Sequence, residues 1–180
     1  VNNVELVDIN KLRDTRAKLA FSKMQCAGND FIVFNAIDQV VENPEGLSVR
    51  LCNRRKGIGA DSLVMVSLSD KADAAMRIFN QDGSEGKMAG NAIRCVAKYL
   101  FDNNVNGIAD MIKKADEHSA NMTIETEAGV KYLTLYMQNG KVSSVKVDMG
   151  KPEFTPANIP TRIQIPEGKE AIVNAPINVE

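Results

Sequence analysis

The sequence has few of the residues that usually carry metal, redox or acid–base chemistry. It contains no tryptophan, one histidine and three cysteines in 180 residues, and only 5% of the residues are aromatic. His118 lies in the polar stretch 113–121, where we expect a solvated loop, so histidine chemistry is nearly excluded. Cys26, Cys52 and Cys95 show neither a close pair nor a metal-ligand spacing, and an odd number argues against a secreted disulfide framework. We therefore expect free thiols and no metal site.

No excess of charge and no long apolar run are present either. The 22 Lys and Arg residues stand against 23 Asp and Glu residues, so the chain has no net field that would attract a polyanion. No apolar stretch approaches the roughly 18 residues of a membrane span, and the first residues are charged rather than signal-like. These absences predict no nucleic-acid partner, no membrane partner and a cytoplasmic protein.

The composition is that of a globular protein, with 44% hydrophobic and 25% charged residues. Residues 1–17 show only a weak apolar pattern and are predicted to be an extension, to which we assign no function. Residues 18–150 carry the regular patterns of one domain. The chain then becomes rich in proline, and we expect residues 151–180 to form a linker and the start of a truncated second domain.

Alternating and β-prone stretches predict most of the regular structure. Asn139-Gly140 suits a type I′ turn between two of these strands, because both residues accept positive φ. A tight turn at residues 26–30 is expected to join the first two. The predicted strands are Lys18–Gln25, Phe31–Ile37, Ser62–Leu68, Ala74–Phe79, Met122–Glu127, Lys131–Gln138 and Lys141–Met149.

Two helices are predicted between the strands. Asn43 can cap the first, with Pro44 at its first position, and its pattern continues to about Arg55. The second follows a glycine-rich loop at residues 80–90 and covers Asn91 to Phe101. Its apolar residues recur at the i, i+3, i+4 and i+7 spacing of a helix packed on a core: Ile93, Val96, Ala97 and Leu100.

Three glycine-containing segments, residues 23–31, 54–61 and 79–91, follow or precede short strands. Each alone would be an ordinary set of turn formers. Their order and spacing, however, resemble the amino-terminal domain of diaminopimelate epimerase from about Phe21 to Gly150. In that family the third loop reads Asn-x-Asp-Gly-Ser-Glu, then Cys-Gly-Asn, then a helix with Arg-Cys. The positions in register are Asn80, Asp82, Gly83, Ser84, Glu85, Gly90, Asn91, Arg94 and Cys95.

The resemblance implies an α+β fold in which a curved mixed or antiparallel sheet wraps a central helix. It also implies interconversion of the LL and meso forms of diaminopimelate in lysine biosynthesis, without pyridoxal phosphate or any other cofactor, in a homodimer. Asn29 and Asn80 match substrate-binding positions. The backbone amides at Gly90 and Asn91 would hold the substrate's α-carboxylate, since unpaired amides at a helix N-terminus bind anions.

The pattern breaks at the position of the family's first catalytic thiol, which is Ala89 here. An epimerase without pyridoxal phosphate needs proton-transfer groups on both faces of the α-carbon, and alanine cannot carry a proton. Either the chain is an inactive form, natural or engineered, or the thiol has moved to Cys26 on the neighbouring turn. Cys52 and Cys95 are predicted to be structural, and Arg94 to pair within the protein.

Two alternatives to diaminopimelate epimerase stay open. The first is another amino-acid racemase of the same fold, because a fold does not determine its substrate. The second is a catalytically inactive module that binds an amino acid. Family members exceed 250 residues and draw their second thiol from a second domain, so this chain alone is expected to be inactive.

Overall fold

A computed structural model of the protein describes residues 4–8, 18–112, 114–155 and 158–159. Ten strands form one sheet in this part of the chain, in the order β1-β2-β3-β4-β5-β8-β9-β10, while β6 pairs with β5 and β7 with β8. The strands are β1 (Val4–Asp8), β2 (Lys18–Cys26), β3 (Asn29–Asn35), β4 (Ser62–Ser67), β5 (Ala74–Asn80), β6 (Glu85–Gly86), β7 (Lys114–Asp116), β8 (Ser119–Thr126), β9 (Gly129–Gln138) and β10 (Lys141–Val147). The helices are α1 (Pro44–Leu51), α2 (Gly90–Asp102), η1 (Val105–Gly107, a 3-10 turn) and α3 (Ile108–Met111).

The sheet is mixed because two of its strand pairs are parallel. β3 pairs in parallel with β4, and β5 pairs in parallel with β8, whereas the other pairs are antiparallel. A parallel pair needs a crossover connection. Helix α1 lies in the connection from β3 to β4, and α2 lies in the connection from β5 to β8.

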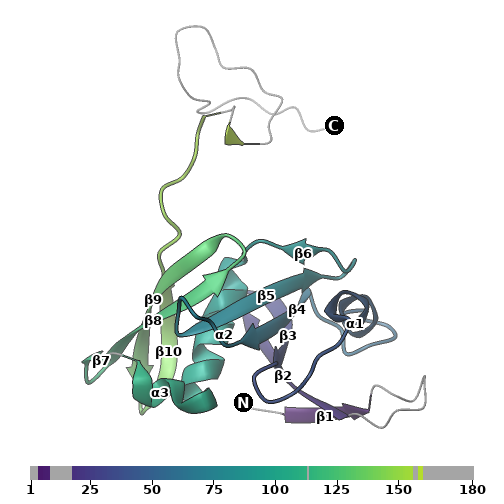
Figure 1. Ribbon diagram of the computed structural model, residues 1–180, viewed down its shortest axis with the longest axis horizontal. Helices are drawn as coiled ribbons and strands as arrows, with labels where there is room; N and C mark the ends of the chain where they lie inside the picture. The colour runs from purple at the N-terminus through teal and green to yellow at the C-terminus, as the bar shows by residue number, and fades with distance from the viewer. Residues whose placement is uncertain (1–3, 9–17, 113, 156–157, 160–180) are drawn as a thin grey trace, which may run out of the picture. The chain divides into compact units, whose positions relative to one another are not determined.

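The sheet curves around α2, which lies in its hollow (Figure 1). The predicted apolar stripe of this helix is the centre of the core, and each of its residues is fully buried: Ile93, Val96, Ala97 and Leu100. They pack against inward-facing residues of β3, β4, β5, β8, β9 and β10. The predicted α+β fold, a curved mixed sheet wrapping a central helix, is confirmed.

Strand β3 is buried on both faces because a helix covers each of them. Phe31 and Val33 belong to the cluster around α2, whereas Ile32 and Phe34 belong to a second cluster under α1. This division follows from the alternation of successive side chains between the two faces of a strand. The continuous apolar run in β3 therefore reflects its position between two helices.

Helix α1 is shorter than the sequence predicted, ending at Leu51 rather than near Arg55. The side-chain oxygen of Asn53 accepts a hydrogen bond of 2.9 Å from the backbone N–H of Arg55, and such a turn competes with the helical hydrogen bonds. Gly57 then passes so close to the helix end that a β-carbon there would lie 2.3 Å from the carbonyl oxygen of Arg50. Only glycine fits at this position.

The predicted hairpin turns are confirmed. Asn139 and Gly140 adopt φ values of 53° and 72°, which are the left-handed conformations of a type I′ turn. Ala27 and Gly28 form the corresponding turn between β2 and β3, with φ values of 51° and 90°. The strand predicted to reach Met149 ends at Val147, after an irregularity in its pairing between Val142 and Ser144.

Several short elements were not predicted from the sequence. These are the strands β6 and β7, the turn η1 and helix α3. Residues Val4–Asp8, which fall within the predicted extension, form the edge strand β1 and pair antiparallel with β2, Val4 lying opposite Ser22. The rest of that extension, residues 1–3 and 9–17, lies outside the described residues.

The chain divides into two compact units, Val1–Asp148 and Met149–Glu180. In the second unit, Glu153 accepts hydrogen bonds from the backbone N–H of Thr155 at 2.7 Å and from the side-chain amide of Asn158 at 2.8 Å. These bonds lower the pKa of Glu153 to about 2, the backbone bond from Thr155 most of all. That a second domain starts after residue 150 stays a prediction, because residues 156–157 and 160–180 lie outside the described residues.

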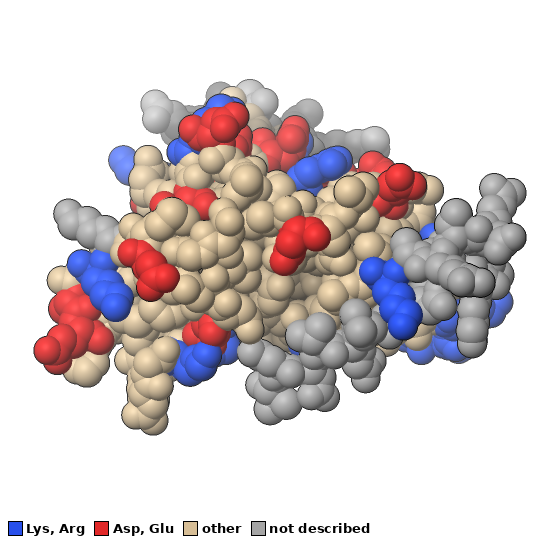
Figure 2. Space-filling model, turned by 60° about the horizontal axis from the view of Figure 1, so that its bottom comes forward, with Lys and Arg blue, Asp and Glu red and all other residues tan. Residues whose placement is uncertain are grey.

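The surface carries charges of both signs. On the face shown in Figure 2, acidic and basic side chains are interspersed and neither sign dominates. This agrees with the balanced composition of the sequence, a net charge of −1. Within the described residues, no helix combines the length and the apolar character needed to cross a membrane.

Candidate active site

A cleft of about 340 Å³ opens at the N-terminus of α2, where the three glycine-containing segments meet. Its volume is within the range of small-molecule sites, about 300 to 1,000 Å³. Ala89 and all four predicted substrate-binding residues line it. The full lining is Asn29, Phe31, Asp61, Ser62, Ile78, Asn80, Gly86, Met88, Ala89, Gly90 and Asn91.

The register of the sheet brings these segments together. Phe31 of β3 lies opposite Ser62 of β4, and Ser62 lies opposite Asn80 at the end of β5. The start of β3, the start of β4 and the end of β5 are therefore neighbours at one end of the sheet. The loop after β5 returns through β6 to Ala89, the N-cap residue of α2.

The first turn of α2 offers unpaired backbone donors to this cleft. Ala89 has an extended conformation and makes no side-chain cap, and the first N–H to bond within the helix is that of Ile93, to the oxygen of Ala89 at 3.0 Å. Among the described residues, no hydrogen-bond acceptor is found for the N–H groups of Gly90, Asn91 and Ala92. Such groups, together with the helix dipole, favour an anion.

The three asparagines of the cleft make hydrogen bonds within the protein. The Nδ2 of Asn91 donates to the Oδ1 of Asn29 at 2.6 Å, and the Nδ2 of Asn29 donates to the Oδ2 of Asp61 at 3.0 Å. Asn80 donates to the hydroxyl of Ser84 at 3.0 Å. Each amide nitrogen carries two hydrogens, so each keeps one N–H for a ligand.

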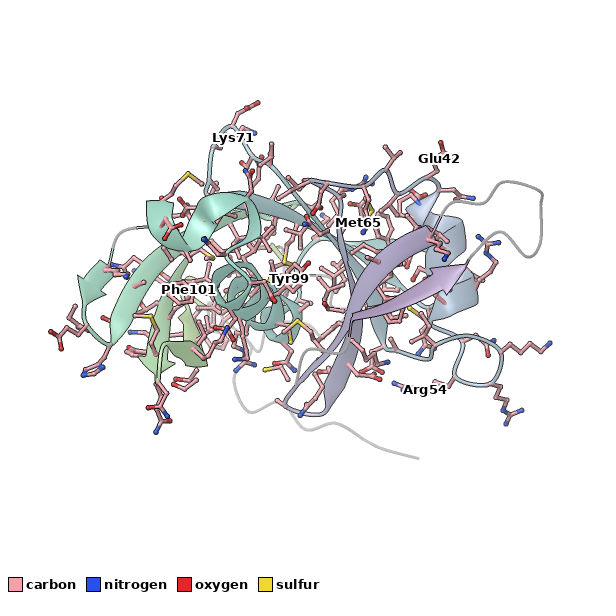
Figure 3. All side chains as sticks on the ribbon, turned by 90° about the horizontal axis from the view of Figure 1, so that it is seen from below. Glu42, Arg54, Met65, Lys71, Tyr99 and Phe101 are labelled. Atoms are coloured by element: carbon pink, nitrogen blue, oxygen red, sulfur yellow. The ribbon has the colours of Figure 1, made fainter. Side chains whose placement is uncertain are left out.

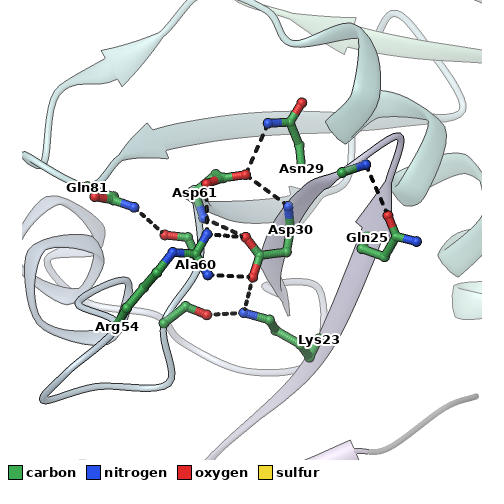
Figure 4. Close-up of polar contacts among 10 residues, drawn as sticks. Lys23, Gln25, Asn29, Asp30, Arg54, Ala60, Asp61 and Gln81 are labelled. Carbon is green, nitrogen blue, oxygen red and sulfur yellow. Dashed lines mark hydrogen bonds and ion pairs between the residues drawn. The ribbon is translucent and has the colours of Figure 1, made fainter.

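Beside the cleft, two carboxylates and two cations form a cluster (Figure 4). Arg54 contacts Asp30 at 2.6 Å and Asp61 at 2.8 Å, and Lys23 contacts Asp30 at 2.8 Å. The hydrogen bond from Arg54 holds the pKa of Asp30 well below its usual range. The hydrogen bond from Asn29 lowers the pKa of Asp61. Both carboxylates are therefore ionised at neutral pH.

This cluster is not predicted by the sequence, although the two turns that contain it belong to the glycine-containing segments. Asp30 follows the predicted substrate-binding Asn29, and Asp61 ends the second glycine-containing segment. The opposite charges near these turns were the available signal. Their pairing was not predictable, because it depends on the parallel register that places β3 beside β4.

Cys26 does not line the cleft that contains Ala89. It lines a second cavity, of about 540 Å³, between β2, α2 and β10, which it shares with Cys95 and Tyr99. Figure 3 shows Tyr99 on α2 between β2 on one side and the strands β8–β10 on the other. Burial, and secondarily the neighbouring Cys26, raises the pKa of Cys95 to about 12. Cys26 lies opposite Asn29 in the register of β2 and β3, but it lines this second cavity rather than the cleft of Ala89. That a relocated thiol at Cys26 acts as the base stays a prediction.

The remaining expectations for single residues agree with the structure. Cys26, Cys52 and Cys95 are free thiols, and Cys52 and Cys95 are buried in the core. His118 is exposed in the turn between β7 and β8. Arg94 bonds within the protein, donating to the backbone oxygen of Gly90 and to the side-chain oxygen of Asn91.

Comparison with known proteins shows the family to which the chain belongs. The family model described as diaminopimelate epimerase matches residues 21–155. The diaminopimelate epimerase of Agathobacter rectalis is 44% identical over 142 residues, 79% of this chain and 46% of the relative. That of Acetivibrio thermocellus is 41% identical over 162 residues, 90% of this chain and 52% of the relative. The chain therefore spans about half the length of these relatives.

A solved structure supports the same fold. A probable proline racemase from Agrobacterium radiobacter superposes with a TM-score of 0.55 at 22% identity, over 71% of this chain and 40% of that one. At this identity the likeness concerns the fold alone. The sequence relatives and the matching family model decide the family, and the chain belongs to the diaminopimelate epimerase family.

Proposed function

We propose that this chain forms the amino-terminal half of a diaminopimelate epimerase, which interconverts LL- and meso-diaminopimelate by proton transfer without pyridoxal phosphate. The observation that carries the proposal is the opening turn of α2. Of its three unpaired N–H groups, those of Gly90 and Asn91 belong to residues that line the cleft beside Asn29 and Asn80. They are suited to the α-carboxylate of an amino acid, whose α-carbon would then lie near Ala89.

Binding and acidification of the substrate would use the same groups. Removing an α-proton places negative charge on the α-carbon and its carboxylate, and fixed N–H donors stabilise this charge without reorganising. Gly90 leaves room for the carboxylate to approach the backbone closely. The amides of Asn29 and Asn80 would bind further polar groups of the substrate, since an amide both donates and accepts hydrogen bonds.

Ala89 stands where a thiol would face the α-carbon in this proposal. Its position as N-cap of α2 is one at which a cysteine has a lowered pKa. The second thiol would come from the half of the protein that this chain does not span. We therefore expect the chain to bind substrate groups on one side of the α-carbon and to be inactive by itself.

The family also suggests the setting of the activity. We propose a role in lysine biosynthesis in the cytoplasm, in a homodimer that needs neither a metal nor an organic cofactor. The small-molecule substrate is the expected partner, with no nucleic acid and no membrane. The first alternative is another racemase of this fold, and its substrate would be a different amino acid.

The alanine at position 89 specifically favours a second candidate, a catalytically inactive module that binds an amino acid. Such a module would keep the donors of α2 and the asparagines but transfer no proton. It differs from the epimerase in one measurable way. It binds diaminopimelate without exchanging the α-proton, even when a thiol is restored at position 89.

The proposed function is tested with the chain fused to the carboxyl-terminal half of a full-length relative. We expect calorimetry to detect binding of diaminopimelate, and much weaker binding of L-lysine, which lacks the second carboxylate, and of L-proline. The relative's own full-length enzyme is the positive control. Equal or tighter binding of proline would transfer the proposal to another racemase, and no binding of any amino acid would refute it.

A further inference from the structure

A continuous series of hydrogen bonds runs across one side of the cleft. Arg94 donates to the Oδ1 of Asn91, the Nδ2 of Asn91 donates to Asn29, and the Nδ2 of Asn29 donates to Asp61. Arg54 donates to the other oxygen of Asp61 at 2.8 Å. The series joins α2 to the starts of β3 and β4. From Arg94 to Asp61, each residue of the series donates to the next, and Arg54 donates to Asp61 from the other side.

The two ends of this series determine its direction. An ionised carboxylate only accepts hydrogen bonds, so Asn29 must turn its nitrogen toward Asp61. A guanidinium only donates, so Asn91 must turn its oxygen toward Arg94. Turning either amide over would place N–H against N–H at one contact and oxygen against oxygen at another. The charged ends thus leave a single orientation for both amides.

Asp61 is itself held in its acceptor role. Besides Asn29, it accepts a hydrogen bond of 3.1 Å from the backbone N–H of Asp30 and pairs with Arg54. Figure 4 shows Asp61 surrounded by these donors. Asp30 binds the same guanidinium at 3.0 and 2.6 Å, so Arg54 stays in place between the two carboxylates.

The orientation of the Asn29 and Asn91 amides determines which of their groups remain available to a ligand. Each oxygen of the two amides already accepts one bond inside the protein, and each nitrogen keeps one N–H without a partner in the described part of the chain. Both residues line the cleft next to the unpaired N–H groups of α2. The two amides and the first turn of α2 therefore present N–H donors that suit a carboxylate, while the Asp61 carboxylate, which also lines the cleft, is already paired with Asn29, Asp30 and Arg54.

We propose that Asp61 and Arg94 are positioning residues, which orient the amides of Asn29 and Asn91 so that both present N–H donors to a substrate carboxylate. The proposal rests on the proposed function and deepens it. Neither charged residue needs to touch the substrate. Their effect passes through two neutral side chains that, without charged neighbours, could turn either way.

The first test observes the amides directly, without any ligand. In the isotopically labelled chain, Asp61→Ala is expected to shift the side-chain NH₂ resonances of both Asn29 and Asn91. The Asn91 side chain bonds to Asn29 and Arg94 rather than to Asp61, so an effect confined to the partners of Asp61 would leave its resonances unchanged. Unchanged Asn91 resonances would overturn the proposal. Should Asp61→Ala fail to fold, the nearly isosteric Asp61→Asn replaces it and is expected to act in the same direction.

A matched control exists elsewhere in the chain. Asp110 accepts a hydrogen bond of 2.8 Å from the amide of Asn104, which is the same kind of contact outside the cleft. Asp110→Ala is expected to move the Asn104 resonances and to leave those of Asn29 and Asn91 in place. From the other end of the series, Arg94→Met is expected to shift the Asn91 amide, whereas Arg94→Lys, which still donates, is expected to restore it.

The second test measures the effect on the ligand. In the fusion with a relative's carboxyl-terminal half, Asp61→Ala is expected to weaken diaminopimelate binding by about tenfold to a hundredfold. Asp110→Ala is expected to leave binding unchanged. If Asp61→Ala binds as tightly as the parent, the positioning role is wrong. If the parent itself binds no diaminopimelate, the proposed function fails, while the amide resonances still decide whether Asp61 and Arg94 orient the two asparagines.

Discussion

Ala89→Cys, introduced into the fusion with a relative's carboxyl-terminal half, is expected to raise exchange of the diaminopimelate α-proton with deuterated water by about a hundredfold or more. The reason is that Ala89 lines the cleft and caps α2 beside three unpaired N–H groups. A thiol there would have its pKa lowered from its ordinary value of about 8.5, so a larger fraction of thiolate would be available as a base near neutral pH. Mass spectrometry or proton NMR measures the exchange.

Two companion variants make this result specific. Ala89→Ser has a similar size but carries a hydroxyl, a far weaker acid than a thiol, and is expected to leave exchange near the starting value. Cys26→Ala in the parent fusion is also expected to change nothing, because Cys26 lines a different cavity. If Cys26→Ala abolished a measurable exchange, the relocated thiol would be the correct reading. If Ala89→Cys gave no exchange despite binding, the inactive binding module would be favoured.

Leu100→Ala is expected to lower the free energy of unfolding by about 2 to 5 kcal/mol. Leu100 is fully buried on the face of α2 that the sheet surrounds. Removing three carbon atoms there loses apolar burial and leaves a cavity that the curved sheet must close around. Because domains of this size have only about 5 to 15 kcal/mol of stability, the change is a large fraction of the total. Urea unfolding followed by circular dichroism measures it.

The control uses the same substitution at an exposed position. Leu68, which follows β4, is 60% exposed, and Leu68→Ala is expected to change the free energy of unfolding by less than about 0.5 kcal/mol. Equal effects of the two substitutions would mean that α2 is not the centre of the core. That result would also remove the support for the position of its first turn in the cleft.

The major elements of the fold could be predicted because local patterns agree with the tertiary structure. The stripe of α2 and the Asn139-Gly140 turn follow from periodicity and positive φ, which depend on neighbouring residues only. The end of α1 could not be placed, since it depends on the side chain of Asn53 and on the close approach of Gly57. The pairing of β1 with β2 was missed because a short edge strand has little pattern of its own.

Some residues of the candidate site could likewise be predicted from the sequence, and others could not. Asn29, Asn80, Gly90 and Asn91 were predicted from a resemblance to a family, and they do line one cleft. The role of Asp61 was not predictable, since it depends on hydrogen bonds across strands that are distant in sequence. Which cavity a cysteine reaches also depends on the curvature of the sheet. For this reason the sequence could suggest Cys26 but could not show that it lines a different cavity from Ala89.

The first turn of α2 is proposed to bind the carboxylate of an amino acid. A titration of the ¹⁵N-labelled chain with diaminopimelate, followed through the backbone N–H resonances of Gly90, Asn91 and Ala92, observes this binding at the donors themselves. We expect these three to shift most and to saturate together, while 1,5-diaminopentane, which has the same amines but no carboxylate, leaves them unmoved. Resonances that stay fixed while others in the chain shift would contradict the claim.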